Sequence, residues 1–227
     1  MKQLIIMSII TNHEGKRLVS YKRIVGGPLA SNTYIVYEGD EAFIVDAGAE
    51  PDKVLEAIKE MGVKVRFIVL THGHFDHVFY VSRLMDSLSA RAYIHQADIT
   101  VMRRSSIYGE QFYNEKFVEP ASIETVSDND KLTLGNKEAR IIHTPGHSPG
   151  SICIHIENLL FTGDTLFRGT IGRTDLPGGS EELMAQSLRK VAKLPQSTRV
   201  LPGHGHESTI GYELSSNYLL RKMIGLE

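Results

Sequence analysis

Hydrophobic residues alternate with polar ones, or stand together in short blocks, through the first part of the chain. The segment "SNTYIVYEGDEAFIVDAG" (31–48) holds two such blocks separated by Gly39 and Asp40, a pattern that predicts two strands joined by a turn. The run "VRFIVL" (65–70) is almost continuously apolar, as expected of a strand buried on both faces. A further strand is predicted at "ARAYIH" (90–95).

Between these strands the hydrophobic spacing changes to that of a helix. Over residues 50–63 one helical face collects the apolar positions Val54, Leu55, Ile58 and Met61. Pro51 suits the first turn, and Gly62 can end the helix. The next helix is predicted over residues 78–88. Residues 104–120 show no regular pattern, so we expect an irregular segment there.

The second half repeats the arrangement of strands followed by a helix. Strands are predicted at residues 131–135, 139–144, 151–156 and 159–164, with turns at Gly135–Asn136 and Glu157–Asn158.

Residues 180–194 then form an amphipathic helix, with Ser180 placed to cap its first turn. A last strand (198–205) and a short helix (around 211–223) follow. Two halves of this kind can pack sheet against sheet with helices outside both, which predicts an α/β fold.

The composition narrows the classes of function. The 227 residues carry 25 basic and 27 acidic side chains without a long run of either sign, which gives no footprint for nucleic acid or an anionic membrane. With 41% hydrophobic residues the chain can bury a core, and we expect a single domain over residues 1–227. One cysteine, Cys153, excludes an internal disulfide and fits a reducing, cytoplasmic location.

The first residues, "MKQLIIMSII", raise the question of a signal peptide. The apolar run is short, and "TNHEGKR" follows where a cleavage site would need small residues. We therefore interpret the segment as a buried first strand. No stretch reaches the roughly 18 apolar residues of a membrane span.

Histidine and aspartate gather where the predicted strands end. The segment "THGHFDHV" (71–78) directly follows one strand and holds three histidines and an aspartate. Three more candidates each follow a separate strand: His147, Asp164 and His204. Loops at strand ends are where a rigid scaffold presents functional groups, so we expect these side chains to form one site.

The set is too large for one tetrahedral zinc ion and suits two metals that share a carboxylate. Its members are His72, His74, Asp76, His77, His147, Asp164 and His204. Imidazole and carboxylate without thiolate favour two zinc ions, with iron or manganese as alternatives. A solvated loop explains a single His-x-His as well, but not donors at four strand ends. The other histidines are interpreted as packing or surface residues, with His206 close to the site: His13, His95, His143, His155 and His206.

Five motifs together resemble the metallo-β-lactamase superfamily. They are "IVDAG" (44–48), "THGHFDH" (71–77), "TPGHSPGS" (144–151), "FTGDTLF" (161–167) and "PGHG" (202–205), and they span nearly the whole chain. The resemblance implies a four-layer αβ/βα sandwich with a dinuclear metal site at one edge.

Position by position, the resemblance also implies a role for each donor. His72, His74 and His147 would hold the first metal, Asp76, His77 and His204 the second, and Asp164 would bridge them. Asp46 of "IVDAG" matches an aspartate that supports the ligands from behind, and ligating groups need such partners to fix their orientation.

Two features point to a subclass. Asp164 stands where the commonest zinc β-lactamases have a cysteine, which argues against an antibiotic hydrolase. The segment "FRGTIGRTDLPGGS" (167–180) is similar to that of glyoxalase II, the hydroxyacylglutathione hydrolases, and persulfide dioxygenases share a similar "GRTD". Arg173 and Asp175 are expected to brace each other beneath the site, with substrate contact by Arg173 as the alternative.

Two departures from glyoxalase II concern the substrate. Only 21 residues follow His206, so we expect no C-terminal helical extension of the kind that contacts glutathione. Phe79 and Tyr80 replace small residues of many relatives and are predicted to line the mouth of the site.

The leading hypothesis is hydrolysis of a small thioester by hydroxide held between the two metals and oriented by Asp76. Hydrolysis of lactones or other esters is a close alternative. A persulfide dioxygenase would use one iron held by His72, His147 and Asp164. A metal-binding module without catalysis is the alternative from another class. The sequence leaves the oligomeric state open.

Overall fold

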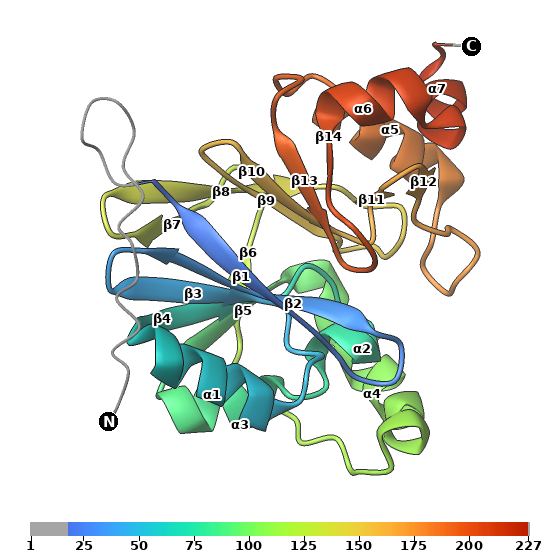
Figure 1. Cartoon of the computed structure of the whole chain (residues 1–227). Helices are drawn as coiled ribbons and strands as arrows, with labels where there is room; N and C mark the ends of the chain where they lie inside the picture. Colours follow the sequence, from blue (N-terminus) through green and yellow to red (C-terminus); the bar gives the residue numbers. More distant parts are fainter. Residues whose placement is uncertain (1–17, 227) are drawn as a thin grey trace.

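Two mixed β-sheets face each other in the structure, a computed structural model that describes residues 18–226 (Figure 1). The first sheet has the order β1-β2-β3-β4-β5-β6, and the second has the order β14-β13-β10-β9-β8-β7. Helices α1 and α3 cover the outer face of the first sheet, and α5 and α7 cover that of the second. The predicted four-layer αβ/βα sandwich is therefore confirmed.

The first half of the chain builds the first sheet and its helices. Its strands are β1 (Ser20–Gly26), β2 (Ser31–Glu38), β3 (Glu41–Val45), β4 (Lys64–Val69), β5 (Arg91–His95) and β6 (Glu124–Val126). Its helices are α1 (Pro51–Met61), α2 (Phe75–Val78), α3 (Val81–Leu88), the 3-10 turn η1 (Gln96–Asp98) and α4 (Ile99–Tyr113). Strands β1 to β3 pair antiparallel, and β3 to β6 pair parallel.

The second half builds the second sheet. Its strands are β7 (Lys131–Leu134), β8 (Lys137–His143), β9 (Ile152–Ile156), β10 (Leu159–Gly163), β13 (Arg199–Pro202) and β14 (Ser208–Thr209), and β11 (Leu166–Phe167) and β12 (Thr170–Ile171) form a separate ribbon. The helices are α5 (Glu181–Val191), α6 (Ile210–Ser216) and α7 (Tyr218–Ile224). Strands β8, β10 and β13 run in one direction, because β9 is antiparallel to both β8 and β10, and β10 is parallel to β13.

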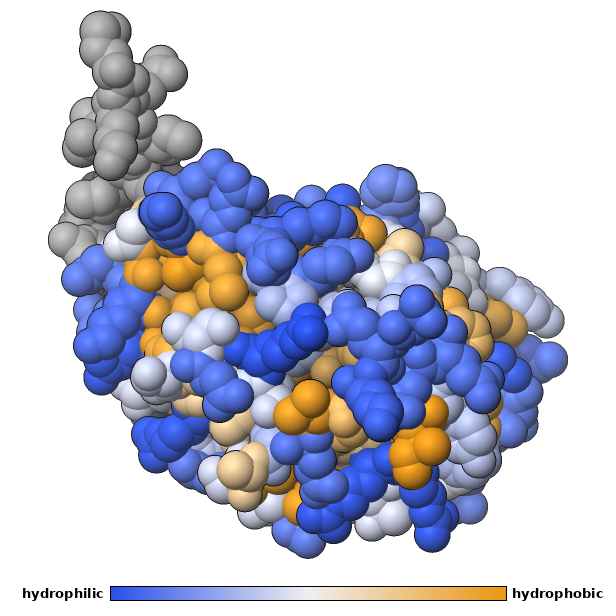
Figure 2. Space-filling model, turned by 90° about the horizontal axis from the view of Figure 1, so that it is seen from below, coloured by the Kyte–Doolittle hydropathy of each residue, from blue (hydrophilic) through white to orange (hydrophobic). Residues whose placement is uncertain are grey.

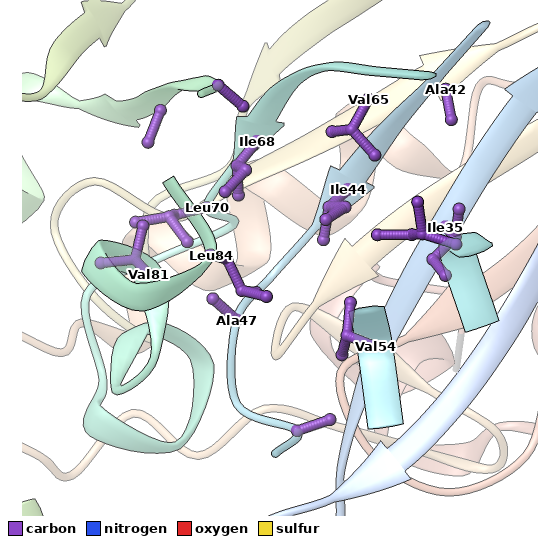
Figure 3. Packing of buried hydrophobic residues seen from close by; sticks show 14 of the residues in the cluster. Ile35, Ala42, Ile44, Ala47, Val54, Val65, Ile68, Leu70, Val81 and Leu84 are labelled. Atoms are coloured by element: carbon purple, nitrogen blue, oxygen red, sulfur yellow. The ribbon is translucent and has the colours of Figure 1, made fainter. Parts of the chain in front are cut away.

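The hydrophobic pattern accounts for the layers. Along β3, Ile44 points to the outer layer and packs with Val54 of α1 and Leu84 of α3, as Figure 3 shows. Its neighbours Phe43 and Val45 point the other way, into the core between the sheets. This alternation is what two-sided burial of a strand requires.

The segment predicted to be irregular is largely helical, and this prediction was wrong. Helix α4 runs through Tyr113, and its buried face is made by Met102, Ser106 and Gly109. Ile107 and Phe112 are exposed, so the helix lacks the apolar stripe that a hydrophobic pattern would reveal.

Seen from the helical side of the first sheet, the surface is mostly hydrophilic with separate hydrophobic areas (Figure 2).

Three smaller predictions also need correction. The helix predicted over 78–88 begins only at Val81, after the separate turn α2. The strand predicted over 198–205 is shorter, because β13 ends at Pro202, and the helix predicted around 211–223 is divided at Asn217 into α6 and α7. The predicted first strand lies outside the described residues.

Candidate metal centre

The predicted donors lie in the segments that follow the carboxyl ends of their strands, with Asp76 and His77 in the short helix α2. The segment after β4 carries His72, His74, Asp76 and His77, and single donors follow β8, β10 and β13. Residue Asp46 follows β3, which is parallel to β4. Carboxyl ends of strands that run in one direction meet at one edge of a sheet, and this edge is where the two halves of the chain combine their donors.

Three imidazoles form a first triad. His72, His74 and His147 each offer a ring nitrogen, and these nitrogens lie within 4.8 Å of one another. His72 Nδ1 lies 3.0 Å from Thr71 Oγ1, and His147 Nδ1 lies 2.9 Å from the Arg173 carbonyl oxygen. A carbonyl can only accept, so His147 Nδ1 carries the proton and Nε2 is left with a lone pair for a cation.

A second triad combines a carboxylate with two imidazoles. Asp76, His77 and His204 each offer one donor atom within 4.8 Å of the others. Asp76 Oδ2 lies 3.0 Å from His204 Nε2 and 3.4 Å from His77 Nε2. His77 Nδ1 lies 2.8 Å from Asp46 Oδ2, which directs His77 Nε2 toward the other two donors.

Asp164 lies between the two triads. Its Oδ2 is 3.6 Å from His147 Nε2 of the first triad and 3.7 Å from His204 Nε2 of the second. Its Oδ1 is 3.4 Å from His77 Nε2. Asp164 also groups with His72 and His77, one donor from each triad. One carboxylate therefore faces both sets, as a bridging ligand would.

The donors fit divalent cations because two of their atoms lack any hydrogen-bond partner among the described residues. Among the described residues, His72 Nε2 and Asp164 Oδ1 are buried without a hydrogen bond. Burial of such groups is costly unless an unseen partner completes them. His74 Nδ1 and His147 Nε2 lie only 2.8 Å apart, where a shared cation could use both lone pairs. The nitrogen and oxygen donor set suits zinc, iron or manganese.

The electrostatics differ between the triads. Burial, followed by the neighbouring His147, lowers the pKa of His74 to about 3, which keeps it neutral and able to bind metal. Burial also tends to lower the pKa of His77, but the carboxylates of Asp76, Asp164 and Asp46 outweigh it and raise that pKa. The second triad therefore sits in a strongly negative environment that favours a cation.

Asp46 supports donors of both triads from behind. Its Oδ1 accepts the Thr71 backbone N–H at 2.7 Å, and its Oδ2 accepts the Thr71 hydroxyl at 2.9 Å. Thr71 in turn contacts His72, and Asp46 contacts His77 directly. The aspartate has φ 62°, a left-handed conformation that Asp tolerates better than most residues.

The segment that carries His204 is held by the first sheet. Asn32 Nδ2 donates to the Pro202 carbonyl at 2.8 Å, and Tyr34 Oη donates to the same oxygen at 2.8 Å. The Asn32 N–H donates to the Gly203 carbonyl at 2.7 Å. The second triad is thus assembled across the interface between the sheets.

Arg173 and Asp175 form the pair that the sequence predicts. Arg173 Nε and Nη2 donate to the two Asp175 oxygens at 2.7 and 2.8 Å, and both side chains are largely exposed. The pair lies on the surface rather than beneath the site. The backbone of Arg173, not its side chain, holds His147.

Phe79 and Tyr80 do not present the apolar surface that the sequence predicts at the mouth of the site. Their side chains are 3% and 5% exposed. Phe79 stacks on Tyr113 at 4.0 Å between ring centroids, and Tyr80 Oη donates to Glu115 at 3.2 Å. The prediction was wrong because the helix α4, which it did not include, supplies Tyr113 and covers these rings.

Two supporting residues were missed by sequence analysis. Thr71 connects Asp46 to His72, and buried Asp98 contacts the loops of His72 and His147. Thr71 is the first residue of the "THGHFDH" motif, so its position carried a signal. Asp98 follows a different strand, β5, and nothing in its local sequence sets it apart.

The family of the chain follows from comparison with known proteins. The family model described as the metallo-beta-lactamase superfamily matches residues 26–204, a range that includes every donor described above. The chain belongs to the metallo-beta-lactamase superfamily. This superfamily binds divalent metals, in agreement with the donor clusters, and the comparisons together place the chain among its metallo-hydrolases.

Two curated relatives are similar over most of their length. YqgX of Bacillus subtilis, named a probable metallo-hydrolase, is 34% identical over 207 residues, which cover 89% of this chain and 98% of the relative. The hydroxyacylglutathione hydrolase GloC of Haemophilus influenzae is 31% identical over 206 residues, which cover 83% and 92%.

Two solved structures share the fold at higher than 25% identity. The BLEG-1 B3 metallo-beta-lactamase matches with a TM-score of 0.78 and 33% identity over 88% of this chain and 99% of that one. TTHA1623, solved in a di-iron-bound form, matches with a TM-score of 0.78 and 33% identity over 87% and 98%. Within residues 18–226, no helix is both long and apolar enough to cross a membrane.

Proposed function

We propose that this protein is a dinuclear metal-dependent hydrolase of thioesters. The observation that carries the proposal is the position of Asp164 between two complete donor triads, each able to hold one cation. The similarity to GloC, a hydroxyacylglutathione hydrolase, supports a thioester as the substrate. Zinc is the preferred metal, and the di-iron form of TTHA1623 supports iron as the alternative.

Two bound cations would supply Lewis acidity and a water of lowered pKa. The protein's part is to hold the ligands and to handle the proton. Asp76 Oδ2 lies at the edge of the second triad, 3.0 Å from His204 Nε2, where a carboxylate can orient a water molecule and accept its proton. Cys153 takes no part as a nucleophile, because it is fully buried and burial raises its pKa to about 11.

The proposal includes weak selectivity for the thiol part of the substrate. Glutathione is anionic, and a site selective for it needs cationic contacts. The guanidinium of Arg173, whose backbone carbonyl holds His147, is already engaged by Asp175 through two hydrogen bonds. We expect kcat/KM for S-lactoylglutathione to exceed that for the same acyl group on a small neutral thiol by less than a hundredfold, which corresponds to about 2.7 kcal/mol.

The test is a substrate panel with zinc-loaded and iron-loaded protein. Both lactoyl thioesters, a lactone and a chromogenic cephalosporin are assayed with the unmodified chain, Asp76→Asn and the surface control Asp175→Asn. Thioester hydrolysis that falls at least a hundredfold in Asp76→Asn, and persists in Asp175→Asn, supports the proposal. Oxygen consumption with glutathione persulfide at one iron per chain, without thioester cleavage, would refute it.

Hydrolysis of a β-lactam is the second candidate, because BLEG-1, named a B3 metallo-beta-lactamase, is 33% identical over nearly its full length. Preferential turnover of the cephalosporin in the same panel would replace the thioesterase proposal with this one.

A further inference from the structure

A buried carboxylate joins the two loops that supply the first triad. Asp98 is 0% exposed and ends the turn η1, directly before helix α4. An aspartate at a helix N-cap ordinarily accepts an N–H from the first turn of its own helix. The side chain of Asp98 makes no such bond. It points instead into the metal-site loops.

The contacts of Asp98 reach both sides of the first triad. Its Oδ2 accepts the Gly73 N–H at 2.7 Å and the Ser148 hydroxyl at 2.6 Å, and its Oδ1 accepts the Gly150 N–H at 2.6 Å. Gly73 lies between His72 and His74, and Ser148 directly follows His147. One side chain therefore connects segments that follow strands of different sheets. Gly73 and Ser148, its contacts in the two segments, are 75 residues apart in sequence (148 minus 73).

The fit around Asp98 is close on both sides. A Cβ atom at position 73 would lie 2.6 Å from the Asp98 carbonyl oxygen. A Cβ atom at position 150 would lie 2.7 Å from the Asp98 nitrogen and 2.8 Å from its Oδ1. Both loops dock so tightly on residue 98 that neither tolerates a side chain without a shift.

The second triad is anchored by other residues. His77 is held by Asp46, and the His204 segment is held by Asn32. Loss of the Asp98 contacts should therefore act on the first triad in preference to the second.

We propose that Asp98 is a positioning residue that sets the separation of the His72–His74 loop from the His147 loop, and thereby the affinity of the first metal. The inference rests on the proposed metal centre. Partners that orient metal ligands commonly contribute 10- to 100-fold to metal affinity. We expect an effect of that size, confined to the first triad.

The experiment measures Zn²⁺ affinity of the metal-stripped full chain by competition with a chromogenic chelator, in two backgrounds that leave one triad complete. His204→Ala leaves the first triad, and His74→Ala leaves the second. In the His204→Ala background, Asp98→Asn should weaken Zn²⁺ binding by about 10- to 100-fold. In the His74→Ala background, the same change should weaken it by less than about threefold.

The matched control is Asp128→Asn. Asp128 also accepts a backbone N–H, that of His143 at 2.7 Å, but touches no donor loop in this way. It should leave Zn²⁺ affinity unchanged in both backgrounds. If Asp98→Asn does not fold, Ser148→Ala removes only one of the three contacts and should weaken the first triad alone, by a smaller factor.

The outcomes separate this inference from the proposed function. Equal affinities with and without Asp98→Asn in the His204→Ala background, or equal losses in both backgrounds, would overturn the positioning role. Absence of Zn²⁺ binding in both backgrounds before Asp98 is changed would overturn the metal centre itself. Neither readout depends on which substrate is hydrolysed.

Discussion

At Asp164, one side chain faces imidazoles of both triads. Neutral asparagine has nearly the same shape, but it cannot balance two cations or offer two anionic oxygens. Oδ1 of Asp164 is buried with no hydrogen-bond partner among the described residues. Packing within the protein therefore does not explain why a carboxylate stands at this position. The charge of this residue should therefore matter for metal binding much more than for folding.

We predict that Asp164→Asn lowers kcat/KM by at least a hundredfold and reduces the metal content from two ions per chain toward one, with little change in thermal stability of the metal-free protein. Elemental analysis and steady-state kinetics measure both. Asp175→Asn is the control, because its partner Arg173 and its own side chain are exposed. Two metals and full turnover in Asp164→Asn would show that the bridge assignment is wrong.

A second residue-scale prediction concerns pH. His95 and His143 stack at 4.0 Å between ring centroids, and burial followed by the His143 imidazole lowers the pKa of His95, with Asp128 acting in the opposite direction. The imidazole of His95 therefore becomes protonated at a higher pH in the unfolded chain than in the folded chain. The stabilising contribution is complete above about pH 6.5 and is lost as the pH falls below it.

His95→Gln should therefore lose less stability than the unmodified chain between pH 7.5 and pH 5.5. The free energy of unfolding is measured by urea titration in excess chelator, so that metal release does not contribute. An unchanged difference between the two pH values would argue against a depressed pKa at His95.

At the scale of elements, the strands deliver the donors because β4, β8, β10 and β13 all end at the same edge, and turns directly after them carry the ligands. The helices instead fix the layers. Helix α5 is the clearest case, since Ser180 Oγ accepts the Leu183 N–H at 3.2 Å and Met184 and Leu188 fill the outer core.

Removing the α5 cap should destabilise the fold without disturbing the metal site. Ser180→Ala is expected to lower the free energy of unfolding by about 1 kcal/mol. Thr209→Ala, which removes the equivalent contact to the Tyr212 N–H of α6, is the companion variant. Chemical denaturation with parallel metal analysis checks this, and a loss of metal in Ser180→Ala would mean that the cap also supports the His147 loop.

At the scale of the whole molecule, the core between the sheets holds the two halves in register. Phe161 of β10 is fully buried and lies 5.1 Å from the Tyr34 ring and 6.5 Å from the Phe43 ring, measured between centroids. Tyr34 and Phe43 belong to the first sheet. Each metal triad takes donors from segments of both sheets. The packing of Phe161 between the sheets therefore supports both the fold and the assembly of the triads.

Phe161→Ala should lower the free energy of unfolding by about 3 to 5 kcal/mol, because it leaves a cavity between the sheets. Phe161→Leu should cost less. Denaturation of the metal-free protein gives the size of the effect, and a value below about 1 kcal/mol for alanine would mean that the interface collapses around the gap.

The sequence by itself determined the alternation of the strands, the faces of α1 and α5, and the set of donors. These features depend on local periodicity and on residues adjacent to strand ends, so the local sequence is enough to predict them. The family motifs made the donor set specific, and the fold class followed from the order of strands and helices.

Only the tertiary structure decided which residues are buried and which elements cover them. Helix α4 buries a serine and a glycine and exposes Ile107 and Phe112, so its hydrophobic pattern does not predict a helix. Tyr113 of the same helix stacks on Phe79 and buries it. Asp98 is remote in sequence from the loops it joins. Burial and contact are properties of segments brought together from distant parts of the chain, and no local pattern encodes them.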